Sequence, residues 1–81
     1  MSNESLRSDG VSYEARAEMD SMVRVILVSR GDTVLEGQAL LMVESMKMEM
    51  PVIAETSGTV AEVKVNEGDV VKADDVLVVI D

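Results

Sequence analysis

The residues with the clearest chemical potential surround a single lysine, Lys47. It lies between Met46 and Met48, in the second half of an apolar stretch and shortly before Pro51, the only proline of the 81 residues. Lysine amines are protonated at neutral pH, so they attack an acyl group only when a base and an activated donor are supplied. A second enzyme can supply both. The sequence therefore predicts that Lys47 is an attachment point for an acyl group.

The neighbours of this lysine have a functional and a plain interpretation. Thioether side chains are flexible and adapt to more than one surface, which suits a segment that must dock with several partners. The plain alternative places the methionines in the core and leaves the lysine merely solvated. The flanking carboxylates act either as solubilising charges or in partner selection. The functional interpretation predicts a recognition surface around Lys47 made of Glu44, Ser45, Met46, Met48 and Glu49.

The residue types that are missing narrow the function further. The chain has no histidine and no cysteine, so the usual general base and the strongest nucleophile are absent. The carboxylates and hydroxyls show no spacing that suggests a built site. We therefore expect no catalytic residue, no enzymatic activity of the chain alone and no metal site.

Composition and charge point to a single soluble domain. A formal net charge of -9 disfavours binding to nucleic acid or to an anionic membrane surface. No apolar run approaches the roughly 20 residues that span a bilayer, and the N-terminus lacks the apolar stretch of a signal peptide. Without cysteine there are no disulfides. We expect a cytoplasmic protein with neither nucleic acid nor membrane as partner.

The elements that position Lys47 come from an internal repeat. Residues 17–44 and 54–81 align with an offset of 37 positions and no insertion. Two copies are too few for a solenoid, and they predict a compact domain of two similar halves packed face to face. The matched pairs are Val23 with Val60, Val28 with Val65, Gly31-Asp32 with Gly68-Asp69, Val34 with Val71, and Leu40 with Leu77.

Each copy has the residues of short strands separated by tight turns. Valine and isoleucine are abundant, and their branched side chains favour strands. Tyr13 is the only aromatic residue, so the core must come from Val, Ile, Leu, Met and Ala. Glycine tolerates positive φ and aspartate bonds local backbone amides, so Gly31-Asp32 and Gly68-Asp69 are predicted turns. Short strands at this spacing indicate an all-β sandwich or barrel.

Residues 14–26 have two interpretations. Their apolar residues also fit helical spacing, and the segment is rich in helix formers. The equivalent stretch of the second copy, residues 51–63, contains Pro51 and Gly58 and many β-branched residues. Because the two copies must be alike, we predict that residues 14–26 are extended.

The repeat places Lys47 at the junction of its two copies. Strands over residues 39–45 and 48–54 leave Met46-Lys47 as a two-residue hairpin loop. Such loops usually contain Asn-Gly or Asp-Gly, and a functional demand explains the departure. Residues 1–12 show no pattern and are predicted to be a flexible tail, with the folded domain over residues 13–81.

These motifs resemble the biotinyl domains of biotin-dependent carboxylases over residues 13–81. The resemblance implies a flattened barrel of two four-stranded antiparallel sheets with pseudo-twofold symmetry. It implies that a biotin-protein ligase attaches biotin covalently to Lys47. The biotin would then carry a carboxyl group from a biotin carboxylase to a carboxyltransferase. The matching residues are Gly31-Asp32, Gly37, Glu44 to Glu49, Ala54, Gly58, Val60 and Gly68-Asp69.

Some positions depart from that family's pattern. Ser45 stands where alanine is commoner, and Ser21 stands where the family often has a turn glycine. Nothing is inserted between Asp32 and Lys47, so the protruding "thumb" of some bacterial carriers is missing, and a small free-standing carrier is the best fit. Two alternatives remain. One is a lipoyl carrier, which typically has Asp-Lys-Ala at its tip; the other is an unmodified interaction module with the same barrel.

Overall fold

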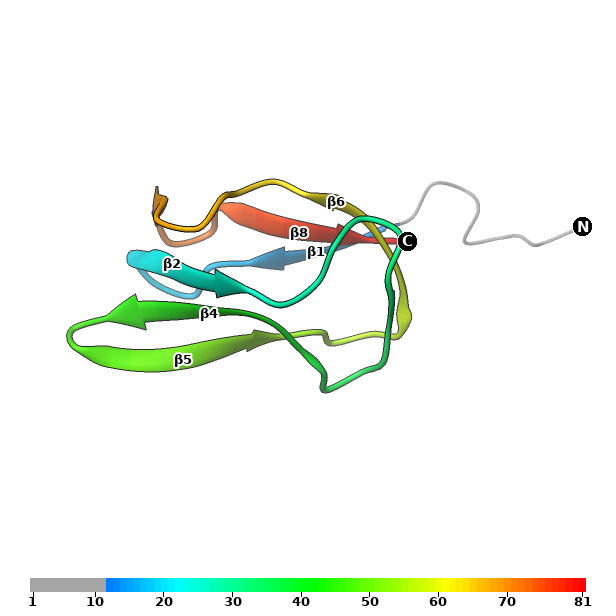
Figure 1. Ribbon diagram of the computed structural model, residues 1–81, viewed down its shortest axis with the longest axis horizontal. Helices are drawn as coiled ribbons and strands as arrows, with labels where there is room; N and C mark the ends of the chain where they lie inside the picture. Colours follow the sequence, from blue (N-terminus) through cyan, green and yellow to red (C-terminus); the bar gives the residue numbers. More distant parts are fainter. Residues whose placement is uncertain (1–11) are drawn as a thin grey trace, which may run out of the picture.

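The computed structural model describes residues 12–81, which form eight strands in two layers (Figure 1). Every strand pair is antiparallel, so the prediction of an all-β domain with two four-stranded antiparallel sheets is confirmed. The strands are β1 (Tyr13–Arg16), β2 (Ser21–Ile26), β3 (Thr33–Val34), β4 (Ala39–Ser45), β5 (Met48–Ile53), β6 (Gly58–Val63), β7 (Val70–Val71) and β8 (Val76–Ile80).

The two sheets are related by the internal repeat. The lysine-bearing sheet has the order β5-β4-β2-β7, and the opposite sheet has the order β1-β8-β6-β3. Strands β2 and β6 begin and end 37 positions apart, as do β3 and β7. Replacing each strand by its repeat partner converts one sheet order into the other. The pseudo-twofold symmetry is therefore built into the strand order.

The copies interlock, which differs from the expectation of two halves that each form one face. Each sheet takes its two central strands from one copy and its two edge strands from the other half of the chain. Edge strands β3 and β7 have only two residues each, too few to form a sheet alone. Their turns bond instead to the other copy: Gly31 N donates to Val60 O at 2.8 Å and Gly68 N donates to Val23 O at 2.7 Å.

The two Gly-Asp turns have the same geometry. Gly31 and Gly68 have φ values of 93° and 94°, which a residue with a Cβ rarely adopts. In each turn the aspartate side chain accepts a backbone N–H three residues earlier. The distances are 2.8 Å from Ser29 N to Asp32 Oδ2 and 2.9 Å from Asn66 N to Asp69 Oδ2. Repeated sequence has thus produced repeated local structure.

Residues 14–26 are extended, as predicted, but they form two strands rather than one. Strand β1 pairs with β8 in the opposite sheet, whereas β2 pairs with β4 and β7 in the lysine-bearing sheet. The chain crosses between the sheets at residues 17–20. At the start of β2, the Ser21 side chain is nearly buried and its Oγ donates to Met19 O at 3.0 Å. Serine is therefore accommodated at this position.

The core consists of small and branched aliphatic side chains between the sheets. Its largest fully buried residues are Leu40, Leu41, Leu77 and Ile80 together with four valines. Methionine was also expected in the core, but in residues 12–81 it contributes no fully buried side chain; Met50 only packs against the cluster. The predicted flexible tail, residues 1–12, falls almost wholly outside the described residues.

Candidate attachment site

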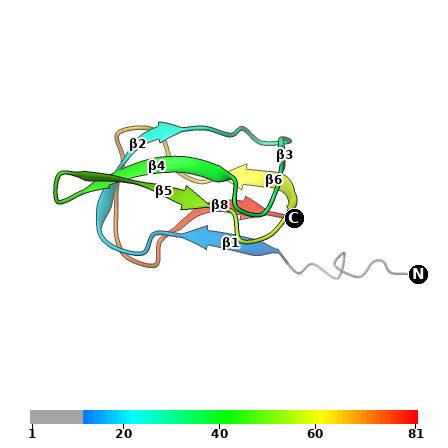
Figure 2. The ribbon, with the colours of Figure 1, turned by 90° about the horizontal axis from the view of Figure 1, so that it is seen from below.

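The β4–β5 hairpin places Lys47 at one end of the molecule. Ser45 and Met48 are the last paired residues, so Met46 and Lys47 alone form the turn. Figures 1 and 2 show the tip of this hairpin at the end of the molecule far from the C-terminus. The site is therefore reached from solvent without passing any other element of residues 12–81.

The turn holds two non-glycine residues in the left-handed region. Met46 has φ of 53° and Lys47 has φ of 66°. Positive φ at both central positions is the mark of a type I′ turn, which matches the twist of the flanking strands. For residues with a Cβ this conformation costs roughly 1 kcal/mol or more each. Backbone strain of this kind clusters at functional sites, and here the strands on both sides hold it in place.

The side chains of the tip are exposed. Met46 is 87% exposed and Met48 is 59% exposed, and Lys47 is exposed between them. The interpretation of these methionines as core residues is therefore wrong. Buried residues of β4, among them Leu41 and Val43, anchor the hairpin instead. The amine is presented by a strand pair that is anchored in the core away from the tip.

Glu44 and Glu49 lie directly opposite each other at the base of the tip. Like charges in this position repel. Arg24 of β2 lies between them, with Nη1 3.2 Å from Glu44 Oε1 and Nε 3.8 Å from Glu49 Oε2. An exposed arrangement of this kind contributes on the order of 1 kcal/mol or less. Its main effect is to fix two carboxylates beside the attachment point.

Ser45 ties the hairpin to the neighbouring loop. Its Oγ donates to Asp20 O at 3.0 Å, and Asp20 Oδ1 accepts from Ala73 N at 2.9 Å. Asp20 thus connects the hairpin with the loop before β8. Sequence analysis missed Arg24 and Asp20, because nothing in their local pattern indicates contact with residues 20 or more positions away. All five predicted flanking residues lie beside Lys47, and the Gly-Asp turns lie elsewhere.

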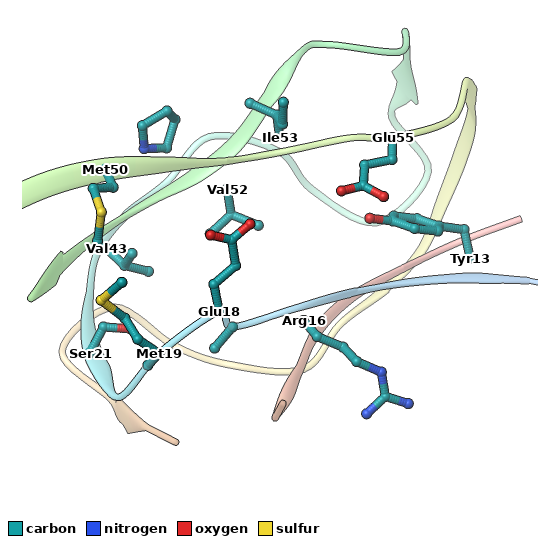
Figure 3. A pocket seen from close by; sticks show the side chains of 12 residues that line it. Tyr13, Arg16, Glu18, Met19, Ser21, Val43, Met50, Val52, Ile53 and Glu55 are labelled. Atoms are coloured by element: carbon teal, nitrogen blue, oxygen red, sulfur yellow. The ribbon is translucent and has the colours of Figure 1, made fainter. Parts of the chain in front are cut away.

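A separate cavity of about 80 Å³ lies between the edge strands β1 and β5 (Figure 3). Tyr13 faces Glu55 at one end of it. Burial raises the pKa of the Tyr13 hydroxyl, and the negative charge of Glu55 and a hydrogen bond to it raise the pKa further. Lys47 does not line this cavity. The cavity is therefore separate from the hairpin that carries Lys47.

Other site types have no support in the described part of the chain. Residues 12–81 contain no group of three or more His, Cys, Asp or Glu side chains placed to hold a metal ion. They also contain no helix of the length and apolar character needed to cross a membrane.

Comparison with known proteins agrees with this geometry. A family model described as "Biotin-requiring enzyme" matches residues 13–80. The chain belongs to this family. Among curated members, the biotinylated protein TB7.3 homolog of Mycobacterium leprae is 45% identical over 70 residues, which cover 86% of this chain and 99% of that protein. The biotin carboxyl carrier protein of Streptococcus mutans is 42% identical over 64 residues, which cover 79% of this chain and 49% of that protein.

Solved structures of the family share the fold. The urea carboxylase of Kluyveromyces lactis matches with a TM-score of 0.82 and 31% identity, covering 86% of this chain and 6% of that chain. The lipoyl domain of the 2-oxoglutarate dehydrogenase complex from Azotobacter vinelandii matches with a TM-score of 0.67 and 31% identity, covering 76% of this chain and 78% of that one. The same barrel therefore occurs both as a small domain and as a minor part of a large carboxylase.

Proposed function

We propose that this chain is a biotin carboxyl carrier in which biotin is held in amide linkage to Lys47. The observation that carries the proposal is the exposed amine on a strained two-residue turn, flanked by exposed methionines, in a member of a biotin-requiring family. Bound biotin supplies a ring nitrogen that accepts a carboxyl group at one enzyme site and gives it up at another. The chain itself supplies no catalytic group and acts as a carrier.

Residues of the hairpin fit this attachment. The Lys47 amine, once deprotonated by a base of the ligase, displaces the leaving group of an activated biotinyl carboxylate, and an amide forms. The lysine charge disappears, so the formal net charge changes from -9 to -10. The lysine stem and the biotin chain together give an arm on the order of 12 Å long, from ordinary bond lengths. The exposed tip leaves this arm free of the barrel.

Three partners follow from the proposal. A biotin-protein ligase loads Lys47, a biotin carboxylase charges the arm, and a carboxyltransferase discharges it. Relatives such as the biotin carboxyl carrier protein and the urea carboxylase support an assignment to the carboxylases in general. We propose further that residues 13–81 act as a separate carrier subunit, because the Mycobacterium leprae relative is matched over 99% of its length.

Intact mass spectrometry tests the attachment. The chain is co-expressed with a biotin-protein ligase, and we expect the mass of one biotin to be added in amide linkage. Lys47→Arg abolishes the adduct, because the guanidinium is not a nucleophile. The matched control is Lys64→Arg, which changes an exposed lysine directly after β6 and retains the adduct. A lipoyl adduct, or an unmodified chain beside an active ligase, overturns the proposal in favour of a lipoyl carrier or an unmodified module.

A further inference from the structure

The outer face of the lysine-bearing sheet carries a row of apolar side chains. Val25 pairs with Met42, and Met42 pairs with Pro51. Residues paired across antiparallel strands point to the same face. Val25 and Pro51 are exposed and Met42 is half-buried, whereas Val43, the next residue of β4, is buried. The row therefore lies on the solvent side of the sheet.

The opposite sheet provides an internal control for this row. The repeat partners of Val25, Met42 and Pro51 are Glu62, Val79 and Glu14, and the same pairing joins them. Two of these three are carboxylates. The backbone positions and the pairing are equivalent, yet the chemistry of the two rows is opposite. Apolar residues in this row are consequently not a requirement of the fold.

The contrast extends to neighbouring positions, although Arg24, Glu44 and Glu49 make the end of this face nearest Lys47 charged. Val25 is 43% exposed and Leu27, just after β2, is 51% exposed, while their partners form an ion pair, with Lys64 Nζ 3.6 Å from Glu62 Oε1. We call the apolar face the set of seven residues Met22, Val25, Leu27, Met42, Pro51, Ile53 and Val70, whose partners are Thr59, Glu62, Lys64, Val79, Glu14, Arg16 and Thr33.

From this asymmetry we propose that the apolar face is the docking surface for the biotin carboxylase that charges the arm, an inference that rests on the proposed function. Strands β4 and β5 carry part of the face and also end in the hairpin that holds Lys47. A partner that covers the face is therefore positioned beside the arm. Because the opposite sheet shows that the fold does not require this apolar surface, a partner that covers it accounts for its presence.

The size of the face favours a transient protein partner over a second copy of this chain. Four strands about 4.8 Å apart, over five residue steps of about 3.3 Å, give an area on the order of 250 Å². A stable dimer needs about 800 Å² from each subunit. The net charge of -9 also opposes self-association. A carrier must leave each enzyme after transfer, and a small interface permits that.

Charge indicates which transient partner fits. Glu44 and Glu49 border the apolar face on the side of Lys47, and the chain as a whole is acidic. A site that binds bicarbonate and the phosphates of ATP collects lysine and arginine side chains. The complement of this surface is thus an apolar patch beside basic side chains. Because carboxylation of biotin consumes bicarbonate and ATP, we expect such basic side chains where the arm enters the biotin carboxylase.

A reciprocal exchange of residue pairs tests the proposal. Val25→Glu with Leu27→Lys gives the lysine-bearing sheet the ion pair of the opposite sheet and leaves the net charge at -9. Glu62→Val with Lys64→Leu is the matched control. Both are made in the Lys47→Arg background, which carries no biotin, and binding to purified biotin carboxylase is measured by calorimetry. We expect the first exchange to raise Kd at least tenfold and the control to change Kd less than twofold.

The same exchanges in the biotinylated chain provide a second measurement. We expect intact mass to show complete biotinylation of both variants. In the carboxylation assay, we expect the KM for the Val25→Glu, Leu27→Lys chain to rise at least tenfold with kcat unchanged, and the control exchange to leave KM unchanged. Equal Kd and KM values for the two exchanges overturn the docking face and leave the carrier function intact. If sedimentation shows that the unexchanged chain self-associates and that the first exchange abolishes this, the face is a dimer interface and the proposed docking of the carboxylase is overturned. Failure of the unexchanged chain to accept biotin or carboxyl refutes the carrier function and the docking face together.

Discussion

The two copies of the repeat, residues 17–44 and 54–81, share their scaffold and differ at their surfaces. Both keep the Gly-Asp turn, the buried valine pairs Val23/Val60 and Val34/Val71, and the limits of their first two strands. They differ at the end of the last strand. Strand β4 continues through Glu44 into the strained hairpin with Lys47 and returns through Glu49. The equivalents of these two glutamates are Asp81 after β8 and Ser12 before β1, and the Ser12 hydroxyl donates a hydrogen bond to the Asp81 carboxylate. The repeat thus accounts for a symmetric barrel, and the strained hairpin belongs to one sheet only.

Positive φ separates the Gly-Asp turns from the hairpin. Both Gly-Asp turns place glycine at positive φ, where it costs little, and the second shared turn has Gly37 at 90° in the first copy and Asp74 at 76° in the second. The hairpin places methionine and lysine there, where the cost is real. Equivalent positions therefore allow a direct comparison of what the fold needs and what the site needs, and four sets of substitutions test it.

Gly58→Ser introduces the residue that the first copy carries at the equivalent position, Ser21. A Cβ at Gly58 would lie 2.2 Å from the backbone oxygen of Asp81 and 2.8 Å from Ile80 Cγ2. We expect a loss of about 3 kcal/mol in the free energy of unfolding, the upper range for overpacking. Thermal or denaturant unfolding measures it. The reverse change, Ser21→Gly, should cost about 1 kcal/mol, mainly the hydrogen bond to Met19 O; equal losses at both positions would contradict the asymmetry.

Gly31→Ala and Gly68→Ala test the symmetric part of the comparison. No heavy atom lies within 4 Å of a Cβ at either position, so the cost comes from the positive φ alone. We expect equal losses of about 1 to 2 kcal/mol for each, and additive losses in the double variant. Denaturant midpoints give these values. Losses that differ by more than about 1 kcal/mol would show that the two turns are not energetically equivalent. For the double variant, independent sites add within about 0.5 kcal/mol.

Met46→Asn relieves the hairpin. Asparagine is favoured in the first central position of a type I′ turn, and Met46 makes no contribution to the core. We expect a gain of about 1 kcal/mol, which raises Tm by roughly 4 to 8 °C in a domain of this size. Met46→Leu is the control, with the fold intact and Tm unchanged. A lower Tm for Met46→Asn would show that the strain lies elsewhere.

Tyr13 and Met50 occupy equivalent positions, and only Tyr13 titrates. Its pKa is raised above the ordinary value of 10.0 by burial and then by Glu55. A raised pKa means that the folded state favours the neutral hydroxyl, so this contribution is complete below pH 10 and is lost as pH rises through the folded pKa. We expect a small loss of stability in that range, which Tyr13→Phe removes.

Absorbance of the tyrosinate measures this titration directly, because Tyr13 is the only aromatic residue of the chain. Glu55→Gln should lower the pKa of Tyr13 by removing the charge, while Glu18→Gln, the equivalent change in the first copy, should leave it unchanged. An unshifted pKa in the Glu55→Gln chain would place the cause in burial alone.

Much of the scaffold follows from local sequence. Strands β4 and β8 begin and end close to where the apolar runs do, and residue pairs such as Gly31-Asp32 reverse the chain through their own conformational preferences. The position of Lys47 between two copies of a repeat was sufficient to predict the hairpin. These features depend on neighbours within a few residues, which a sequence displays directly.

Other features required the folded chain. The interlocking of the copies, the placement of Arg24 between Glu44 and Glu49, and the contact of Ser45 with Asp20 all join residues far apart in sequence. The absence of fully buried methionine in the described residues and the chemical contrast between the outer faces are equally tertiary facts. Sequence determined the strands, the turns and the presented amine, because local sterics and patterning decide them. Which side chains share an exposed face of a sheet became clear only from the folded chain, because the strand register and the neighbouring strand determine that face.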